Sequence, residues 1–109
     1  MSSISLETLF VRHQDTITQL MGERVAFVTA ELPSKDRWTE FSYFISEHGE
    51  HILQGVGRTR IKDETDRYWL VMSEDPNDLL QAILGNDVSR LARKLLVEVI
   101  NYLADCVCE

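Results

Sequence analysis

The chain has 109 residues, of which 44% are hydrophobic and 27% are charged, so it has the size and composition of one globular domain, and wholesale disorder is excluded. Its formal net charge of −7 repels a phosphate backbone, and we therefore expect no nucleic-acid partner. A core of the size this length allows needs neither a metal nor a disulfide to fold, and no cofactor is expected.

The ends of the chain bear on its compartment. MSSISLETLF lacks the basic and continuous apolar regions of a signal peptide, and no apolar run is long enough to span a bilayer. A bridge between Cys106 and Cys108 would close a small strained loop, and the final glutamate does not fit a prenylation box. We expect a cytoplasmic protein that does not bind a membrane.

Residues 6–21 carry apolar positions at helical spacing. Those at i, i+3, i+4, i+7, i+11, i+14 and i+15 share one face: Leu6, Leu9, Phe10, His13, Ile17, Leu20 and Met21. Ser5 suits an N-cap, and Gly22 suits the residue that ends a helix. The pattern predicts an N-terminal helix.

From Arg24 the apolar period changes to two. Four runs rich in β-branched and aromatic residues follow: RVAFVTAEL, WTEFSYFIS, HILQGVGRTRI and RYWLVM. The separators PSKD, EHGE and KDETD are turn-forming, and none is long enough for a crossover helix. The four strands are therefore expected to pair as an antiparallel meander.

Two helices are expected after the strands. One begins near Pro76, with Asp75 or Ser73 as its cap, and ends at Gly85-Asn86. The other starts after Asn86 or Asp87 and runs through SRLARKLLVEVINYLADCV. The predicted fold is a single α+β domain over residues 1–109: an N-terminal helix, a four-stranded antiparallel β-meander and two C-terminal helices (α-β-β-β-β-α-α).

The register of the central hairpin decides which residues share a face of the sheet. A turn at His48-Gly49 would oppose positions 45 and 52, 43 and 54, and 41 and 56. One face would then carry Phe41, Tyr43, Ile45, Ile52 and Val56, with Ala26, Val28, Trp69 and Val71. The other would carry Val25, Phe27, Phe44, Leu53, Tyr68, Leu70 and Met72. A slip of one residue exchanges the faces, but both faces are apolar in either register.

The last helix also carries more apolar surface than one neighbour covers. Its positions form two rows: Val88, Leu91, Ala92, Leu95, Val99, Tyr102 and Cys106, and then Leu96, Ile100, Leu103 and Val107. Either the N-terminal helix covers one sheet face and the C-terminal pair the other, or the surplus surface contacts another chain. Three layers are rare at this length, which favours a homodimer.

The stretch SEHGEHILQGVGRTR, residues 46–60, holds the residues that most resemble a chemical site. His48 and His51 are metal-ligand types, but one lies in the turn and the other enters the strand, and no third ligand is near in sequence. We therefore predict no metal site, and a hairpin turn in which Gly49 takes a positive φ.

Gly55 and Gly57 lie within a strand. A phosphate loop needs its glycines between a strand and a helix, so this pair predicts a bulge, or an aromatic neighbour lying over the missing side chain. In the predicted register the glycines face Ser42 and Glu40, and leave a depression beside Phe44 and Leu53. A partner could dock there.

The remaining polar groups do not form a catalytic set. Arg58, Arg60, Lys62 and Arg67 cluster near the third turn, and Arg90, Arg93 and Lys94 on the last helix, where salt bridges to nearby carboxylates are expected. His13 is read as a core or interface residue. No nucleophile elbow or cleft cysteine is present, so we expect no catalytic residue and no enzyme.

The sequence favours a small acidic non-catalytic protein-binding module, such as a regulator, inhibitor or assembly factor. Its partner would be another protein or a second copy. Ten residues are the candidates for that contact: Val25, Phe27, Phe44, Leu53, Gly55, Tyr68, Leu70, Leu96, Ile100 and Leu103. One alternative is a dimeric cytosolic chaperone, similar to type III secretion chaperones in size and charge, although that family interrupts its strands with a helix. Another is a small-molecule-binding domain with a pocket between sheet and helices.

Overall fold

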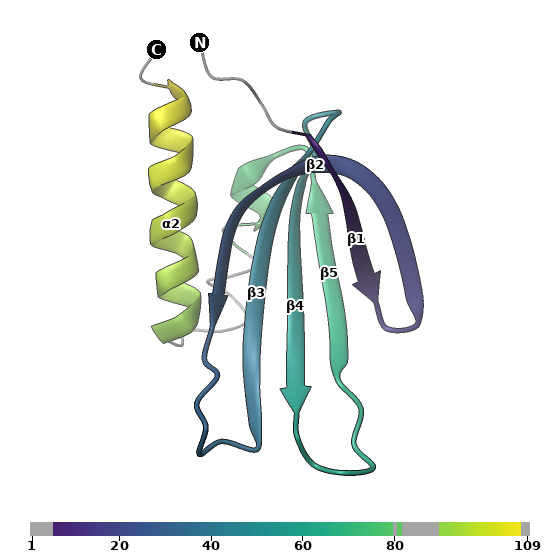
Figure 1. The fold of residues 1–109 in the computed structure, drawn as a ribbon. Coiled ribbons are helices and arrows are strands. Elements are labelled where there is room, and N and C mark those ends of the chain that lie inside the picture. Colours follow the sequence, from purple (N-terminus) through teal and green to yellow (C-terminus); the bar gives the residue numbers. More distant parts are fainter. Residues whose placement is uncertain (1–5, 80, 82–89, 108–109) are drawn as a thin grey trace.

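The computed structural model describes residues 6–79, 81 and 90–107. One antiparallel sheet contains β1 (Glu7–His13), β2 (Thr16–Thr29), β3 (Arg37–Ser46), β4 (His51–Thr59) and β5 (Arg67–Ser73), in that order. A short helix includes residues 76–79 and 81, and the long helix α2 (Arg90–Val107) packs beside β2 and β3 (Figure 1). The sheet curls into a half-barrel that brings β1 next to β5 (Figure 1).

The predicted N-terminal helix is wrong, and with it the order α-β-β-β-β-α-α and the four-stranded sheet. Residues 7–22 form a hairpin of β1 and the first half of β2, joined at Gln14 and Asp15, where Gln14 takes a φ of +52°. The apolar residues of this segment lie on both faces of the hairpin, with Leu9 and Val11 on one and Phe10 and Ile17 on the other, so the sequence shows no strand-like alternation. Its β-branched residues favour the strand: Thr8, Val11, Thr16, Ile17 and Thr18.

The rest of the predicted order is closer to the structure. The turns PSKD, EHGE and KDETD connect β2 to β3, β3 to β4 and β4 to β5, and the meander is antiparallel as predicted. A helix does begin at Pro76, and the last helix is confirmed over Arg90–Val107. The predicted end at Gly85-Asn86 and the predicted start after Asn86 or Asp87 lie outside the described residues.

The predicted register of the central hairpin is wrong by one residue. Ile45 pairs with His51, Tyr43 with Leu53, and Phe41 with Gly55. The cause is the loop, which closes through a hydrogen bond from the Ser46 N–H to the Glu50 carbonyl (2.8 Å) and so has three residues rather than two. Gly49 takes the predicted positive φ, +85°, as the last residue of such a loop commonly does.

The slip exchanges the faces of β4, and two apolar clusters result. The helix-side cluster lies between the sheet and the helices: Ala26, Val28, Phe41, Tyr43, Leu53, Leu79, Ala92, Leu95 and Val99. The inner cluster lies inside the half-barrel: Leu9, Val11, Phe44 and Ile52, with Leu20 and Leu70 against them. Both faces are apolar, as predicted, but the first hairpin of the same chain covers the second face.

Gly22 is the position at which β2 changes neighbours. It pairs with Glu7 of β1 on one side and with Ser46 of β3 on the other. A Cβ added there would lie 2.5 Å from the Ile45 carbonyl oxygen and 2.9 Å from the Leu9 side chain. This close approach lets β2 arch over the sheet, so that its first half lies on the far side of β1 (Figure 1).

Candidate functional site

The first hairpin docks on the rest of the sheet through one buried side chain. The Arg12 N–H donates to Gln54 Oε1 (2.6 Å), and Gln54 Nε2 donates back to the Arg12 carbonyl (2.8 Å) and to the Trp69 carbonyl (2.7 Å). Gln54 is only 7% exposed. Its amide thus acts as an inserted peptide group where β1 and β5 share no regular ladder.

The tip of the hairpin is fixed to β5 by one main-chain and one side-chain hydrogen bond. The Gln14 N–H donates to the Tyr68 carbonyl (3.0 Å), and the Leu70 N–H donates to His13 Nδ1 (3.2 Å). The Arg12 guanidinium lies 4.2 Å from the centroid of the Tyr68 ring, a cation–π contact. The hairpin is therefore held rigidly at this end.

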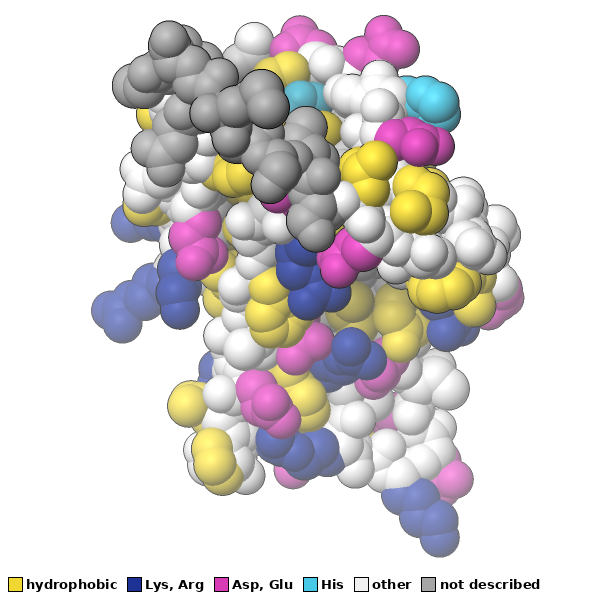
Figure 2. Space-filling view, turned by 45° about the horizontal axis from the view of Figure 1, so that its top comes forward, with side chains coloured by type: hydrophobic (Ala, Val, Ile, Leu, Met, Phe, Trp, Pro, Cys, Tyr) yellow, Lys and Arg dark blue, Asp and Glu magenta, His cyan; other side chains and the backbone are white. Residues whose placement is uncertain are grey.

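The outward face of this hairpin is apolar and exposed. The inward residues Leu9 and Val11 are buried, whereas Phe10 is 66% and Ile17 is 61% exposed. Four residues make up what we call the hairpin patch: Leu6, Phe10, Ile17 and Met21. Hydrophobic side chains come to the surface on the right of Figure 2, the side on which the hairpin lies in Figure 1. A hairpin apolar on both faces needs a second cover.

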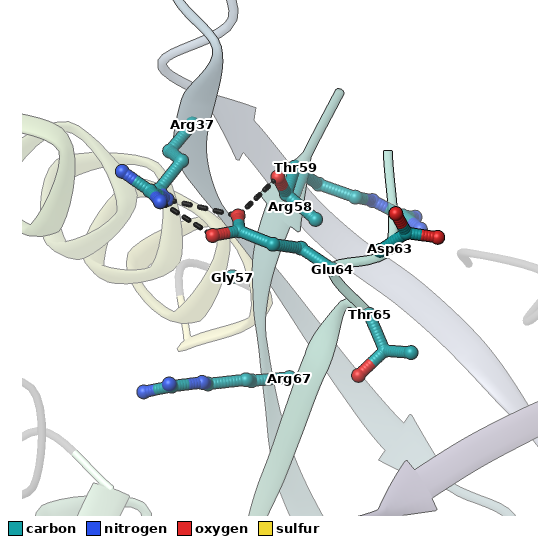
Figure 3. Close-up of a pocket in the computed structure, with 8 residues that line it drawn as sticks. All are labelled: Arg37, Gly57, Arg58, Thr59, Asp63, Glu64, Thr65 and Arg67. Atoms are coloured by element: carbon teal, nitrogen blue, oxygen red, sulfur yellow. Dashed lines mark hydrogen bonds and ion pairs between the residues drawn. The ribbon is translucent and has the colours of Figure 1, made fainter. Parts of the chain in front are cut away.

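A basic pocket of about 540 Å³ lies at the other end of the sheet, between the ends of β3, β4 and β5 (Figure 3). Arg37 Nε donates to Glu64 Oε1 (3.0 Å), and Thr59 Oγ1 donates to the same oxygen (2.7 Å). Hydrogen bonds from Arg37 and Thr59, together with the positive charges of Arg37 and Arg67, lower the pKa of Glu64 to about 2. Within the described residues Arg67 has no ion pair, and it lines the pocket beside Gly57, its ladder partner on β4.

The charged groups of this pocket largely neutralise one another. Glu64 already neutralises Arg37, so an incoming anion would have to displace an internal carboxylate from its strongest partner. Of the arginines that line the pocket, only Arg67 could bind an anion without first losing a carboxylate partner. The pocket fits a structural ion-pair network at the sheet end better than a ligand site.

Arg58 forms a second network on the inner face. It donates to Glu40 (2.8 Å) and to Asp66 (2.9 Å), as the sequence predicted for this basic cluster. Burial raises the pKa of Glu40, but hydrogen bonds from Arg58 and Trp38 and a third from Thr29 more than offset it, so the net pKa is lowered. These groups are satisfied by one another.

His48 and His51 do not form a common site. His48 lies in the loop with an exposed side chain, 3.5 Å from Glu47, while His51 is buried and its Nδ1 lies 2.9 Å from the Tyr43 hydroxyl. Burial lowers the pKa of His51, partly opposed by Asp75, and burial raises the pKa of Tyr43 to about 12. Among the described residues no group of three or more His, Cys, Asp or Glu side chains could hold a metal ion.

The structure distributes the ten predicted contact residues over several environments. Phe44 and Leu70 belong to the inner cluster, and Leu53 and Leu103 to the helix-side cluster. Val25 also packs there, because a register shift between Arg24 and Ala26 turns it to that side.

The others are similarly scattered. Gly55 lies under the Trp69 indole, the aromatic cover that the sequence suggested, although on the helix side of the sheet. Tyr68 lies half-buried under Arg12, and Leu96 is half-buried on α2. Only Phe27 (44%) and Ile100 (48%) are widely exposed. The ten do not form one surface.

The hairpin patch escaped the sequence analysis because its residues were assigned to a helix face. The signal that could have found it is the β-branched content of TLFVRH and TITQLM on either side of Gln14-Asp15, a polar pair placed as in a hairpin.

Comparison with known proteins adds no function. No protein-family model, no curated protein and no solved structure matches the chain. Within the described part of the chain, no helix combines the length with the apolar content that a bilayer span requires.

Proposed function

We propose that this chain is a non-catalytic protein-binding module, and that the hairpin patch is its contact surface. The observation that carries the proposal is the exposure of Phe10 (66%) and Ile17 (61%) on a hairpin whose opposite face buries Leu9 and Val11. Burying a large apolar side chain contributes about 1.5 to 3 kcal/mol. In the monomer, these two side chains contribute little of that to folding.

The charge around the patch suits an apolar contact. Between its members the outward face carries Thr8, Gln19 and Arg12, and the Arg12 guanidinium is engaged by the Tyr68 ring. No carboxylate lies on this face from residue 6 to residue 12 or from residue 17 to residue 21, although the chain as a whole is strongly acidic. An apolar centre depleted of charged residues is typical of a specific protein interface.

The patch is also preorganised. Gln54 and the tip contacts with β5 fix one end of the hairpin, and Gly22 fixes the bend at the other. A partner therefore has little main-chain entropy to remove on binding, which favours affinity for a surface of this size.

The test is retention of binding partners by variants of the full chain. Tagged wild type, Phe10→Ser and Ile17→Ser are purified from the native host, and their co-purified proteins are identified by mass spectrometry. Phe27→Ser is the matched control, because Phe27 is an exposed aromatic residue outside the patch. We expect both patch variants to lose partners that the control retains. Equal retention by all the variants, with unchanged thermal stability, would refute the assignment.

A further inference from the structure

The first half of β2 has an edge whose main-chain groups are unpaired within the described residues, and this edge indicates which partner the hairpin binds. We propose that residues Thr16–Met21 pair in antiparallel register with the same residues of a second copy of this chain. The proposal rests on the proposed function for the choice of the hairpin as contact surface, and it goes further by naming the partner and the main-chain groups.

The first observation concerns the direction of main-chain groups. In an antiparallel ladder, the N–H and C=O of one residue point to the same edge, and successive residues alternate. Both groups of Arg12 are taken by Gln54, so they point away from β2. The N–H and C=O groups of Ile17, the cross-strand partner of Arg12, must then point away from β1.

A second contact shows independently which residues of β2 direct their main-chain groups away from β1. The Met21 carbonyl accepts a hydrogen bond from the Glu47 N–H (2.9 Å), on the side of β2 remote from β1. The N–H and C=O groups of Ile17 and Gln19 therefore line the outer edge. Nothing in the described ranges 6–79, 81 and 90–107 pairs with that edge at these two residues, since β3 meets β2 only from Gly22 onward.

The composition of this edge favours pairing. Exposed edge strands usually carry a lysine, a proline or a bulge that prevents another strand from adding. TITQLM has no charge and no proline, and its pairing with β1 is continuous from Thr16 to Gly22. Its β-branched residues also favour an extended partner strand. The edge is thus unprotected against strand addition.

A second copy suits this edge better than an unrelated strand for two reasons. Antiparallel pairing of a segment with itself has twofold symmetry, so every free group on one copy meets its complement on the other. Two chains of net charge −7 also repel each other, and contact through an uncharged segment limits that cost.

The pairing can be placed in register. With Thr18 on the twofold axis, Ile17 faces Gln19 of the second copy, and both residues exchange N–H···O=C bonds. This register avoids placing Asp15 opposite Glu23 of the second copy, which pairing centred on Gln19 would do. The far edge of β1 already faces Gln54 and β5, so the contact closes as a dimer instead of continuing as a fibre.

The first test uses a residue whose N–H is free in the monomer. Gln19→Pro removes that N–H without removing a β1–β2 ladder bond. Sedimentation equilibrium of the full chain should show a concentration-dependent dimer for the wild type, weakened about tenfold or more in Gln19→Pro. A wild type that stays monomeric, that forms open-ended aggregates, or that dimerises no better than Gln19→Pro would overturn the proposal.

The second test reads the register and does not depend on the proline variant folding. In a background with Cys106→Ser and Cys108→Ser, Thr18→Cys should form an intermolecular disulfide under mild oxidation. Directly opposed residues of a non-hydrogen-bonded pair have Cβ atoms about 4.5 Å apart, within disulfide reach. Gln19→Cys is the matched control and should cross-link poorly. Equal cross-linking at both positions contradicts the register.

Failure of self-pairing and failure of the proposed function give different results. A strict monomer whose Phe10→Ser variant loses a host protein overturns the self-pairing and leaves the binding function standing. A strict monomer whose Phe10→Ser variant retains every partner overturns both the self-pairing and the proposed function.

Discussion

Gln54 holds Arg12 by both of its main-chain groups, through hydrogen bonds of 2.6 Å and 2.8 Å, from a strand that is not a neighbour of β1 in the sheet. The side-chain amide thereby replaces a stretch of ladder between β1 and β5. The half-barrel is closed by side chains here. The docking of the first hairpin therefore depends more strongly on a single residue, Gln54, than strand pairing in an ordinary sheet does.

Replacing Gln54 by leucine should therefore destabilise the fold and loosen the hairpin. Gln54→Leu keeps the volume but leaves the Arg12 N–H and C=O without partners, which should lower the free energy of unfolding by about 2 kcal/mol. Urea denaturation measures that loss, and hydrogen exchange at the Arg12 amide should accelerate. Gln19→Leu, at an exposed position, is the control and should change neither. Unchanged exchange at Arg12 would show that the hairpin is held in another way.

Gly55 and Gly57 should respond differently to the same substitution. A Cβ at Gly55 would lie 2.0 Å from Trp69 Cζ2, so Gly55→Ala must displace the indole, and we expect a loss of about 1 to 3 kcal/mol. A Cβ at Gly57 would lie 3.7 Å from the Arg67 Cβ, an ordinary contact, so Gly57→Ala should be neutral or stabilise by about 0.5 kcal/mol. Thermal unfolding and the Trp69 fluorescence measure both. Equal effects would place the indole elsewhere.

Local signals located the turn segments and the C-terminal helix because each depends on a few neighbouring residues, although the central loop has three residues where two were predicted. Pro76 marks a helix start, and Gly49 takes the positive φ expected of its turn. The first hairpin was missed because LETLFVRHQDTITQLM has apolar residues at helical spacing and, with both hairpin faces apolar, lacks the alternation of a strand. What decides between them is the inner cluster, in which Leu9 packs against residues far away in the sequence, such as Phe44 and Ile52.

The candidate site was harder to predict from the sequence than the fold. The register depends on whether the central loop has two or three residues, and that choice rests on hydrogen bonds between Glu50 and both the main chain and the hydroxyl of Ser46. A change of one residue moved Leu53 under the helices. The free edge of β2 becomes visible only when the partners of Arg12 and Met21 are known, because main-chain parity has no sequence signature.

The Arg37–Glu64 pair should be visible in a titration. Its hydrogen bonds hold the pKa of Glu64 at about 2, below an ordinary value of 4.5. A depressed folded pKa contributes stability above the unfolded pKa and loses it as the pH falls toward the folded one. Arg37→Gln should raise the Glu64 midpoint toward the ordinary value, followed by carboxyl chemical shifts in NMR, and Thr59→Val should raise it less. A midpoint already ordinary in the wild type would contradict the pairing.

Protonation of His51 should destabilise the protein in mild acid. Burial lowers the pKa of this ring below 6.5, so the unfolded chain binds the proton more readily, and stability falls as the pH drops from about 6.5 toward the folded pKa. The loss for one such group is at most about 1.4 kcal/mol per pH unit. Protonation at Nδ1 would also remove the acceptor that the Tyr43 hydroxyl faces at 2.9 Å.

The measurement is the free energy of unfolding from about pH 8 to about pH 5, where histidine titrates. His51→Gln should flatten the decline relative to the wild type, since glutamine cannot take up the proton. His48→Gln is the matched control, because the His48 side chain is 79% exposed in the loop and should leave the slope unchanged. If His48→Gln flattens the profile as much as His51→Gln does, the pH dependence arises from the loop and the buried Tyr43–His51 contact has no part in it.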